Sequence, residues 1–231
     1  MAEPEQRRNF YGRVHGKTLR ASQKDYLAND LEALRLKQVT QEENPTRTVL
    51  HPAAIFASPR PIWLEVGFGG GEHLVHMAAR YPDIGLIGCE PFVNGIAMLL
   101  GKIRQAGVQN LTIHPGDVRD LFDVLPDACL DKAFLNYPDP WPKARHHRRR
   151  FVTPGYLLEL ARVLKPGAEF RVATDIPDYV RQTLEEVPPA GFTLVAQTGK
   201  GDAWEDWLPT RYEQKALREG RAPHYLTFRR I

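Results

Sequence analysis

The feature that most constrains the fold begins at Ile62, where short β-rich apolar runs start to alternate with amphipathic stretches of helical period. This alternation is typical of βαβ units, whose strands form a parallel sheet with helices on both faces. The predicted strands are Ile62–Val66, Ile84–Glu90, Leu111–His114, Leu130–Asn136, Ala168–Thr174, Phe192–Ala196 and His224–Arg229. The predicted helices are Glu72–Arg80, Val93–Ala106, Val118–Leu125, Pro154–Leu164 and Pro177–Val187. No long helix separates the last two strands. We therefore expect an α/β fold with a Rossmann-like, doubly wound, mostly parallel seven-stranded sheet that ends in an antiparallel hairpin.

The chain is long enough for one domain and too short for two. Its 231 residues, 42% of them hydrophobic, suit one packed domain over residues 61–231 and a basic extension over residues 1–60. The extension lacks strand alternation, so we expect it to be partly mobile, with one short helix near Ser22–Leu36. Lys165-Pro166-Gly167 predicts a helix stop and a turn into the next strand.

Hydropathy and cysteine content bear on the compartment. No window approaches the roughly 18 apolar residues that span a bilayer, and the polar N-terminus indicates neither a signal peptide nor an anchor. Cys89 and Cys129 both lie in apolar segments, which is typical of buried thiols in a reducing compartment. We therefore expect a cytoplasmic protein without membrane contact, and the sequence leaves open whether it is a monomer or a homodimer.

The net charge is only +3, but the cations are unevenly placed. The first 24 residues contain only two acids, Glu3 and Glu5, and a larger set of cations: Arg7, Arg8, Arg13, Lys17, Arg20 and Lys24. A second basic run contains no acid and consists of Lys143, Arg145, His146, His147, Arg148, Arg149 and Arg150. Two basic blocks on a nearly neutral chain predict contact with a polyanion. The alternative for such a run is a solvated charged surface.

A glycine-rich tract joins the first strand to the first helix. It reads Glu65-Val66-Gly67-Phe68-Gly69-Gly70-Gly71-Glu72. Gly67 and Gly69 would let a ligand approach the backbone closely. In a dinucleotide fingerprint the third glycine would fall at Glu72, where a carboxylate opposes a pyrophosphate. Because S-adenosylmethionine carries cationic sulfonium and ammonium groups and no phosphate, the acids at Glu65 and Glu72 favour this cofactor over a dinucleotide.

Two further acids follow the next two strands. Glu90 closes the second strand, about 20 residues after the glycines, where a carboxylate can accept both ribose hydroxyls. Asp117 follows the third strand, placed to meet the adenine edge, although a helix N-cap before Val118 is an equal alternative. Because the carboxyl ends of parallel strands share one edge, we expect these acids to lie together.

The fourth strand ends in a stiff loop, Asn136-Tyr137-Pro138-Asp139-Pro140-Trp141-Pro142-Lys143. The prolines fix φ on both sides of Asp139 and restrict the residues before them. Such a loop is suited to holding one carboxylate and one aromatic face beside a ligand. Tyr137 or Trp141 could stack on a base, while core packing is the alternative for Trp141.

Several motifs together resemble one family. Glu65-Val66-Gly67-Phe68-Gly69, Pro138-Asp139-Pro140-Trp141, Lys143, Arg145-His146, Thr174-Asp175 and Thr210-Arg211-Tyr212-Glu213 occur in the order seen in tRNA (guanine-N7)-methyltransferases. The similarity spans residues 62–231, and Arg7-Arg8-Asn9-Phe10-Tyr11-Gly12-Arg13 resembles the extension of many bacterial members. The resemblance implies the class I methyltransferase fold. It also implies methyl transfer from S-adenosylmethionine to N7 of the variable-loop guanosine (position 46) of tRNA.

The resemblance also implies roles for individual residues. Cofactor contacts fall on Glu65, Glu90, Asp117 and Asp139, and Asp139 is also the catalytic residue. Substrate contacts fall on Lys143, Asp175, Thr210, Arg211, Tyr212 and Glu213. Contacts to RNA fall on Arg145, His146, His147, Arg148, Arg149 and Arg150.

Other interpretations stay open at this point. Thr210 and Glu213 also fit a capping box, and Asp175 fits a helix cap. Because Asn136-Tyr137-Pro138 partly resembles the loops of amino-methylases, the rival activity is methylation of an exocyclic amine on DNA or protein. A non-catalytic RNA-binding module and a dehydrogenase are weaker rivals. His73 and His76 share one helix face but lack further ligands at metal-binding spacing, so we expect no metal site.

Overall fold

The computed structural model describes residues 10–231. Its strands are β1 (Ile62–Val66), β2 (Gly85–Cys89), β3 (Leu111–His114), β4 (Leu130–Asn136), β5 (Leu164–Thr174), β6 (Phe192–Thr198) and β7 (His224–Arg230). Its α-helices are α1 (Ala21–Asn29), α2 (Leu31–Leu34), α3 (Glu72–Arg80), α4 (Val93–Ala106), α5 (Val118–Phe122), α6 (Pro154–Val163), α7 (Pro177–Glu186) and α8 (Arg211–Arg218). Short 3-10 helices are η1 (Pro52–Ala54), η2 (Ala144–Arg149) and η3 (Pro188–Ala190).

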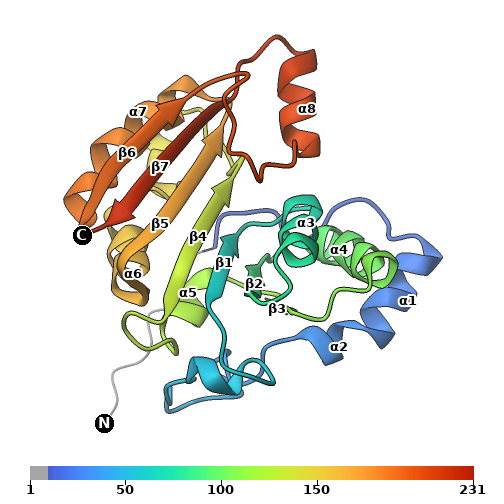
Figure 1. The fold of residues 1–231 in the computed structure, drawn as a ribbon. Coiled ribbons are helices and arrows are strands. Elements are labelled where there is room, and N and C mark those ends of the chain that lie inside the picture. Colours follow the sequence, from blue (N-terminus) through green and yellow to red (C-terminus); the bar gives the residue numbers. More distant parts are fainter. Residues whose placement is uncertain (1–9) are drawn as a thin grey trace.

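All seven strands form one sheet in the order β3-β2-β1-β4-β5-β7-β6. Strands β1 to β5 pair in parallel, whereas β7 pairs antiparallel with both β5 and β6. Helices α5, α6 and α7 cover one face of the sheet, and α3 and α4 cover the other (Figure 1). The predicted doubly wound α/β fold with an antiparallel end is therefore confirmed. Among residues 10–231, no helix is both long and apolar enough to cross a membrane.

One predicted turn lies inside a strand. Lys165-Pro166-Gly167 was expected to separate helix from strand, but β5 already begins at Leu164. Leu130 pairs with Leu164 and Lys132 with Glu169, so the pairing shifts register across this segment. Gly167 takes a positive φ of 82°, and the segment forms an irregularity within the β4–β5 pairing instead of ending it.

The described part of the N-terminal extension lies against the domain. The expected single helix is divided at Asp30 into α1 and α2, and α1 packs on α4. Arg104 of α4 pairs with Asp30 at 2.6 Å. Leu36 and Val39 are buried in the core. The extension therefore contributes to packing from residue 10 onward, while Arg7 and Arg8 lie outside the described residues.

Candidate functional site

A cavity of about 710 Å³ lies at the carboxyl ends of the parallel strands. The ends of β1, β2 and β4 contribute to its wall, as does the segment after β3, so the topology brings together side chains far apart in sequence. The predicted site residues that line it are Gly67, Gly69, Glu90, Asp117, Asp139, Arg149, Arg150 and Tyr212. This is the edge where ligands bind in open α/β sheets.

The glycine loop forms the floor of one end of the cavity. Gly67 has φ +71° and nothing within 4 Å of the position of a Cβ, so its backbone is open to a ligand. Gly69 has φ +55°, and a Cβ there would lie 3.0 Å from the Tyr212 ring. Both positions therefore disfavour any other residue, one by conformation alone and the other by conformation and space.

Helix α4 approaches this loop more closely than a side chain would allow. A Cβ on Gly95 would lie 2.3 Å from the carbonyl oxygen of Gly69, a backbone atom that cannot rotate away. We expect Gly95→Ala to destabilise the protein by about 1–3 kcal/mol, as overpacking of a tight contact does. Urea denaturation measures this change.

Gly155 provides the matched control for that substitution. It lies in the first turn of α6 with nothing within 4 Å of its Cβ position. Gly155→Ala should be neutral, or stabilising by up to about 1 kcal/mol, because alanine suits a helix better than glycine. Equal effects at the two positions would contradict the close contact at Gly95.

Glu90 is the buried acid of the cavity. Its Oε2 accepts a hydrogen bond from the backbone N–H of Gly69 at 2.7 Å, and its Oε1 accepts one from Phe92 at 3.0 Å. The side chain therefore ties the end of β2 to the glycine loop. Burial raises the pKa of Glu90 to about 7, although the two backbone hydrogen bonds act in the opposite direction and lower it. A carboxylate retains further lone pairs beyond these two bonds, so it can still accept hydroxyl groups.

Asp117 serves as an N-cap and also lines the cavity. It accepts a hydrogen bond from the backbone N–H of Arg119 at 2.9 Å, at the start of α5. The Arg119 side chain donates to the same carboxylate, from Nε at 3.0 Å. The capping interpretation of the sequence is therefore confirmed. Because Asp117 also reaches the cavity wall, capping and ligand contact are compatible.

The loop that carries Asp139 is bent by two unusual residues. Tyr137 has φ +50° and Trp141 has φ +40°, both in the left-handed region that residues other than glycine rarely adopt. Conformations of this kind cost about 1–3 kcal/mol each and persist where the surroundings enforce them. The side chain of Asp139 opens into the cavity between them. Desolvation by the walls raises its pKa, and the positive charge of Arg13 opposes that shift.

Glu65 takes a different place from the one expected for a cofactor contact. It is 2% exposed and is absent from the cavity lining. Its Oε2 lies 2.8 Å from Nδ1 of His73, and Asn136 donates to its Oε1 at 3.4 Å. Within the described chain, Glu65 therefore belongs to a buried polar cluster beneath the loop and supports the cavity from behind.

The C-terminal motif, Thr210–Glu213, forms the start of α8, beyond the carboxyl ends of β4 and β5 (Figure 1). The Thr210 hydroxyl accepts a hydrogen bond from the backbone N–H of Glu213 at 3.2 Å, so Thr210 caps the helix. The buried Glu213 carboxylate accepts bonds from Trp207 Nε1 at 2.7 Å and from the Tyr225 hydroxyl at 2.9 Å. Only Tyr212 of this motif lines the cavity.

The remaining predicted substrate contacts are Arg211, Asp175 and Lys143. The Arg211 guanidinium lies over the Tyr212 ring, 4.9 Å from its centroid. Asp175 is buried and paired with Arg221, whereas Lys143 is exposed. Neither Asp175 nor Lys143 is part of the cavity wall.

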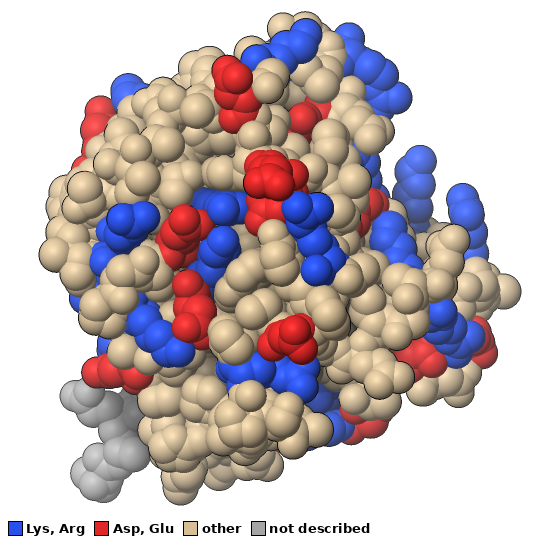
Figure 2. Space-filling view, in the orientation of Figure 1, with Lys and Arg blue, Asp and Glu red and all other residues tan. Residues whose placement is uncertain are grey.

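The basic run is not uniform. Arg145 and Arg148 are exposed and His146 is partly exposed, whereas His147 lies 3.2 Å from the Asp178 carboxylate. Arg149 stands between two aromatic rings, 4.5 Å from the centroid of Tyr11 and 5.0 Å from that of Trp141. Figure 2 shows Lys and Arg at the top of the face drawn there, where α8 lies, and also across its centre and lower edge, with acids among them.

Arg150 corrects the expectation that the whole run faces RNA. It is 1% exposed, and its guanidinium contacts protein oxygens from two segments, the Asp139 loop and α7. The sequence pattern concealed this because burial of one arginine depends on the carbonyls and amides that surround it.

Some residues of the site escaped the sequence interpretation. Phe10, Tyr11, Gly12 and Arg13 line the cavity, although the N-terminal run was interpreted only as an RNA contact. Hydrogen bonds between Asn94 and the backbone of Gly16 and Lys17 hold this segment beside α4. The sequence signal was the resemblance of the run ending at Arg13 to family extensions. Among the described residues, no group of three or more His, Cys, Asp or Glu side chains is placed to bind a metal.

Comparison with known proteins gives consistent results. A family model described as "Putative methyltransferase" matches residues 59–226. The tRNA (guanine-N(7)-)-methyltransferase of Paracoccus denitrificans is 75% identical over 97% of this chain and 95% of its own. That of Cereibacter sphaeroides is 76% identical over 96% and 91%. The solved 16S rRNA methyltransferase KamB is 17% identical, with a TM-score of 0.57 over 80% of this chain and 99% of its own, and shares the fold.

Proposed function

The chain belongs to the family of tRNA (guanine-N(7)-)-methyltransferases, and we propose from this premise that it methylates N7 of a variable-loop guanosine in tRNA. The methyl donor is S-adenosylmethionine, and the products are 7-methylguanosine and S-adenosylhomocysteine. One observation carries the proposal: a buried carboxylate beside a glycine loop, Glu90, shares a cavity with Asp139 on a constrained loop.

The cavity suits the proposed cofactor. Gly67 leaves backbone open where the methionine part would pass. Glu90 is positioned to accept the ribose hydroxyls, and Asp117 lies farther along the same wall for the adenine. The three acids of the lining, Glu90, Asp117 and Asp139, complement a cofactor with sulfonium and ammonium cations. Glu65 supports this loop through His73 instead of lining the wall.

The chemistry of N7 methylation does not require Asp139 to act as a base. When bound, the cofactor supplies an electrophilic methyl group. N7 of guanine has a free lone pair at neutral pH, so no proton has to leave and a strong base is unnecessary. Asp139 accepts hydrogen bonds from the amino or imino hydrogens of the guanine and stabilises the positive charge that develops on the ring. The stiff loop holds the base in line, and this alignment lowers the barrier further.

We assign the RNA side of the site to groups around the cavity mouth. Arg145, His146, Arg148 and Arg149 would contact phosphates, because they are at least partly exposed and lie directly after the Asp139 loop. Tyr212 lines the cavity with the Arg211 guanidinium over its ring, and Lys143 and Asp175 lie outside the cavity wall. One unstacked guanine enters the cavity, as enzymes that act on bases require. Acting on tRNA, the protein would work in the cytoplasm, as a monomer or a homodimer.

The raised pKa of Glu90 predicts a pH dependence of cofactor binding. Its carboxylate form accepts the ribose hydroxyls, and this form predominates above its pKa of about 7. As the pH falls through this value the group is protonated, so affinity should fall about tenfold between pH 8 and pH 6. Isothermal titration calorimetry with S-adenosylmethionine measures this change. Glu90→Gln should bind more weakly and lose the dependence; a wild-type profile that is flat would contradict the role of Glu90.

The direct test is incubation of the purified protein with S-adenosylmethionine labelled in the methyl group and with tRNA, followed by nucleoside analysis. We expect label in 7-methylguanosine. Label in an exocyclic methylated amine, or in protein or DNA instead of tRNA, would establish the rival activity. Binding of tRNA without binding of the methyl donor would indicate a non-catalytic RNA-binding module.

A further inference from the structure

The buried arginine at the end of the basic run has no role in the function proposed above. Arg150 follows η2 directly, and its side chain is 1% exposed. A buried guanidinium is retained only where oxygens surround it, since burying an unpaired charge is costly. The oxygens that surround Arg150 identify what it holds.

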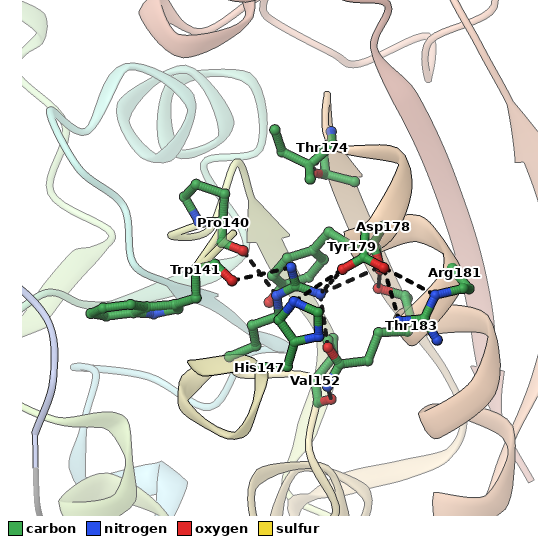
Figure 3. A network of polar contacts seen from close by, with 12 residues as sticks. Pro140, Trp141, His147, Val152, Thr174, Asp178, Tyr179, Arg181 and Thr183 are labelled. Carbon is green, nitrogen blue, oxygen red and sulfur yellow. Dashed lines mark hydrogen bonds and ion pairs between the residues drawn. The ribbon is translucent and has the colours of Figure 1, made fainter. Parts of the chain in front are cut away.

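Two of those oxygens belong to the loop that carries Asp139. Arg150 Nε donates to the carbonyl of Pro140 at 2.9 Å, and Nη2 donates to the carbonyl of Trp141 at 3.4 Å. Figure 3 shows both carbonyls directed into the network and the indole of Trp141 directed away from it. The guanidinium therefore holds the backbone immediately after Asp139, including the left-handed residue Trp141.

The other side of the guanidinium is fixed to α7. Nη1 donates to Asp178 Oδ2 at 2.8 Å and to Gln182 Oε1 at 2.9 Å. Gln182 is fixed in turn, because its Nε2 donates to the carbonyl of Val152 at 3.0 Å. The guanidinium also lies 5.1 Å from the ring centroid of Tyr179. The loop is thus attached to a helix of the core through one side chain.

We propose that Arg150 is a positioning residue for methyl transfer: by bridging the Pro140 and Trp141 carbonyls to α7, it sets the place of Asp139 relative to the bound guanine. This inference rests on the proposed function and assigns to it a residue to which that function gave no role. A guanidinium is suited to the task because its donors point in fixed directions within one plane, whereas a lysine ammonium is a single point of charge. Lysine at this position would keep the charge but could not reach the loop and the helix together.

The test compares Arg150→Lys with the wild-type protein in three measurements. These are kcat for tRNA methylation, the Kd for S-adenosylmethionine by calorimetry, and the thermal unfolding midpoint. Because a small displacement of a reacting group lowers turnover strongly, we expect kcat to fall about 10- to 100-fold, with the cofactor Kd within about threefold of wild type. A wild-type kcat would overturn the proposal, and so would a loss of kcat matched by an equal loss of cofactor affinity.

Arg171→Lys is the matched control. Arg171 is also largely buried, pairs with Asp206 at 2.7 Å and with Glu169 at 3.1 Å, and lies 5.1 Å from the ring centroid of Trp204. Its partners Asp206, Glu169 and Trp204 all lie outside the Asp139 loop, so its variant should lose stability without a comparable loss of kcat. If both variants lost kcat equally, Arg150 would contribute only to the stability of the fold, and the inference would be overturned.

A second variant keeps the test decisive if Arg150→Lys does not fold. Gln182→Met removes one anchor of the guanidinium while keeping Arg150 and its contacts to the loop. We expect a smaller loss of kcat than for Arg150→Lys, again with an unchanged cofactor Kd, and an unchanged kcat would count against the proposal. Inactivity of the wild-type protein on tRNA would instead refute the proposed function.

Discussion

Replacing Asp139 with alanine is expected to lower kcat for tRNA methylation by about 10²- to 10³-fold, as loss of a group that stabilises developing charge does in other enzymes. The cofactor Kd should change far less. Asp139 stands at the carboxyl edge between two left-handed residues, so its contribution lies in where its carboxylate is held. Single-turnover kinetics and calorimetry measure the two quantities separately.

Two further variants define the origin of that effect. Asp139→Asn keeps the size of the side chain and a hydrogen-bond acceptor but removes the charge. If the charge of Asp139 stabilises the developing positive charge, kcat of Asp139→Asn should lie between the values for wild type and for Asp139→Ala. Asp83→Ala removes an exposed acid before β2, at the opposite edge of the sheet, and should leave kcat unchanged. A rate for Asp139→Ala equal to that of wild type would remove Asp139 from the mechanism.

The second large effect is expected at Glu90. We predict that Glu90→Ala raises the Kd for S-adenosylmethionine by about 100-fold, because hydrogen bonds to a charged acceptor contribute about 1.5–3 kcal/mol each. The substitution also leaves the backbone N–H groups of Gly69 and Phe92 without their acceptor, which loosens the glycine loop. Calorimetry or equilibrium dialysis with the cofactor measures the change.

The Glu90 and Asp139 variants should therefore differ in how their turnover responds to added cofactor. For Glu90→Ala, the turnover rate at saturating cofactor should approach that of wild type, because Asp139 and its loop remain in place. For Asp139→Ala, added cofactor should restore little. If both variants lost affinity and turnover in the same proportion, the division of labour between the two acids would be wrong.

Much of the fold was predictable because hydrophobic periodicity is a local property. The bounds of β1, β3, β4, α3 and α4 agree with those expected from the sequence. Glycines, prolines and acids at strand ends also indicated the cavity edge, since parallel strands place their carboxyl ends together. Errors arose where neighbours in space changed a local signal. Lys165-Pro166-Gly167 looks like a turn, yet pairing with β4 continues across it.

What the sequence by itself determined is the order of strands and helices and the set of acids and glycines at one edge, because these depend on period and on position along the chain. Only the tertiary structure decided the assignment of similar side chains to different tasks. Glu65 and Glu90 both lie at the carboxyl end of a strand, but His73 and Asn136 contact Glu65, whereas Glu90 lines the cavity. Arg149 and Arg150 are adjacent, yet one lies at the cavity mouth between aromatic rings and the other is enclosed by carbonyl and carboxylate oxygens. The physical reason is that the environment of a charge is set by groups distant in sequence, and that environment determines whether the charge binds a ligand or holds the fold.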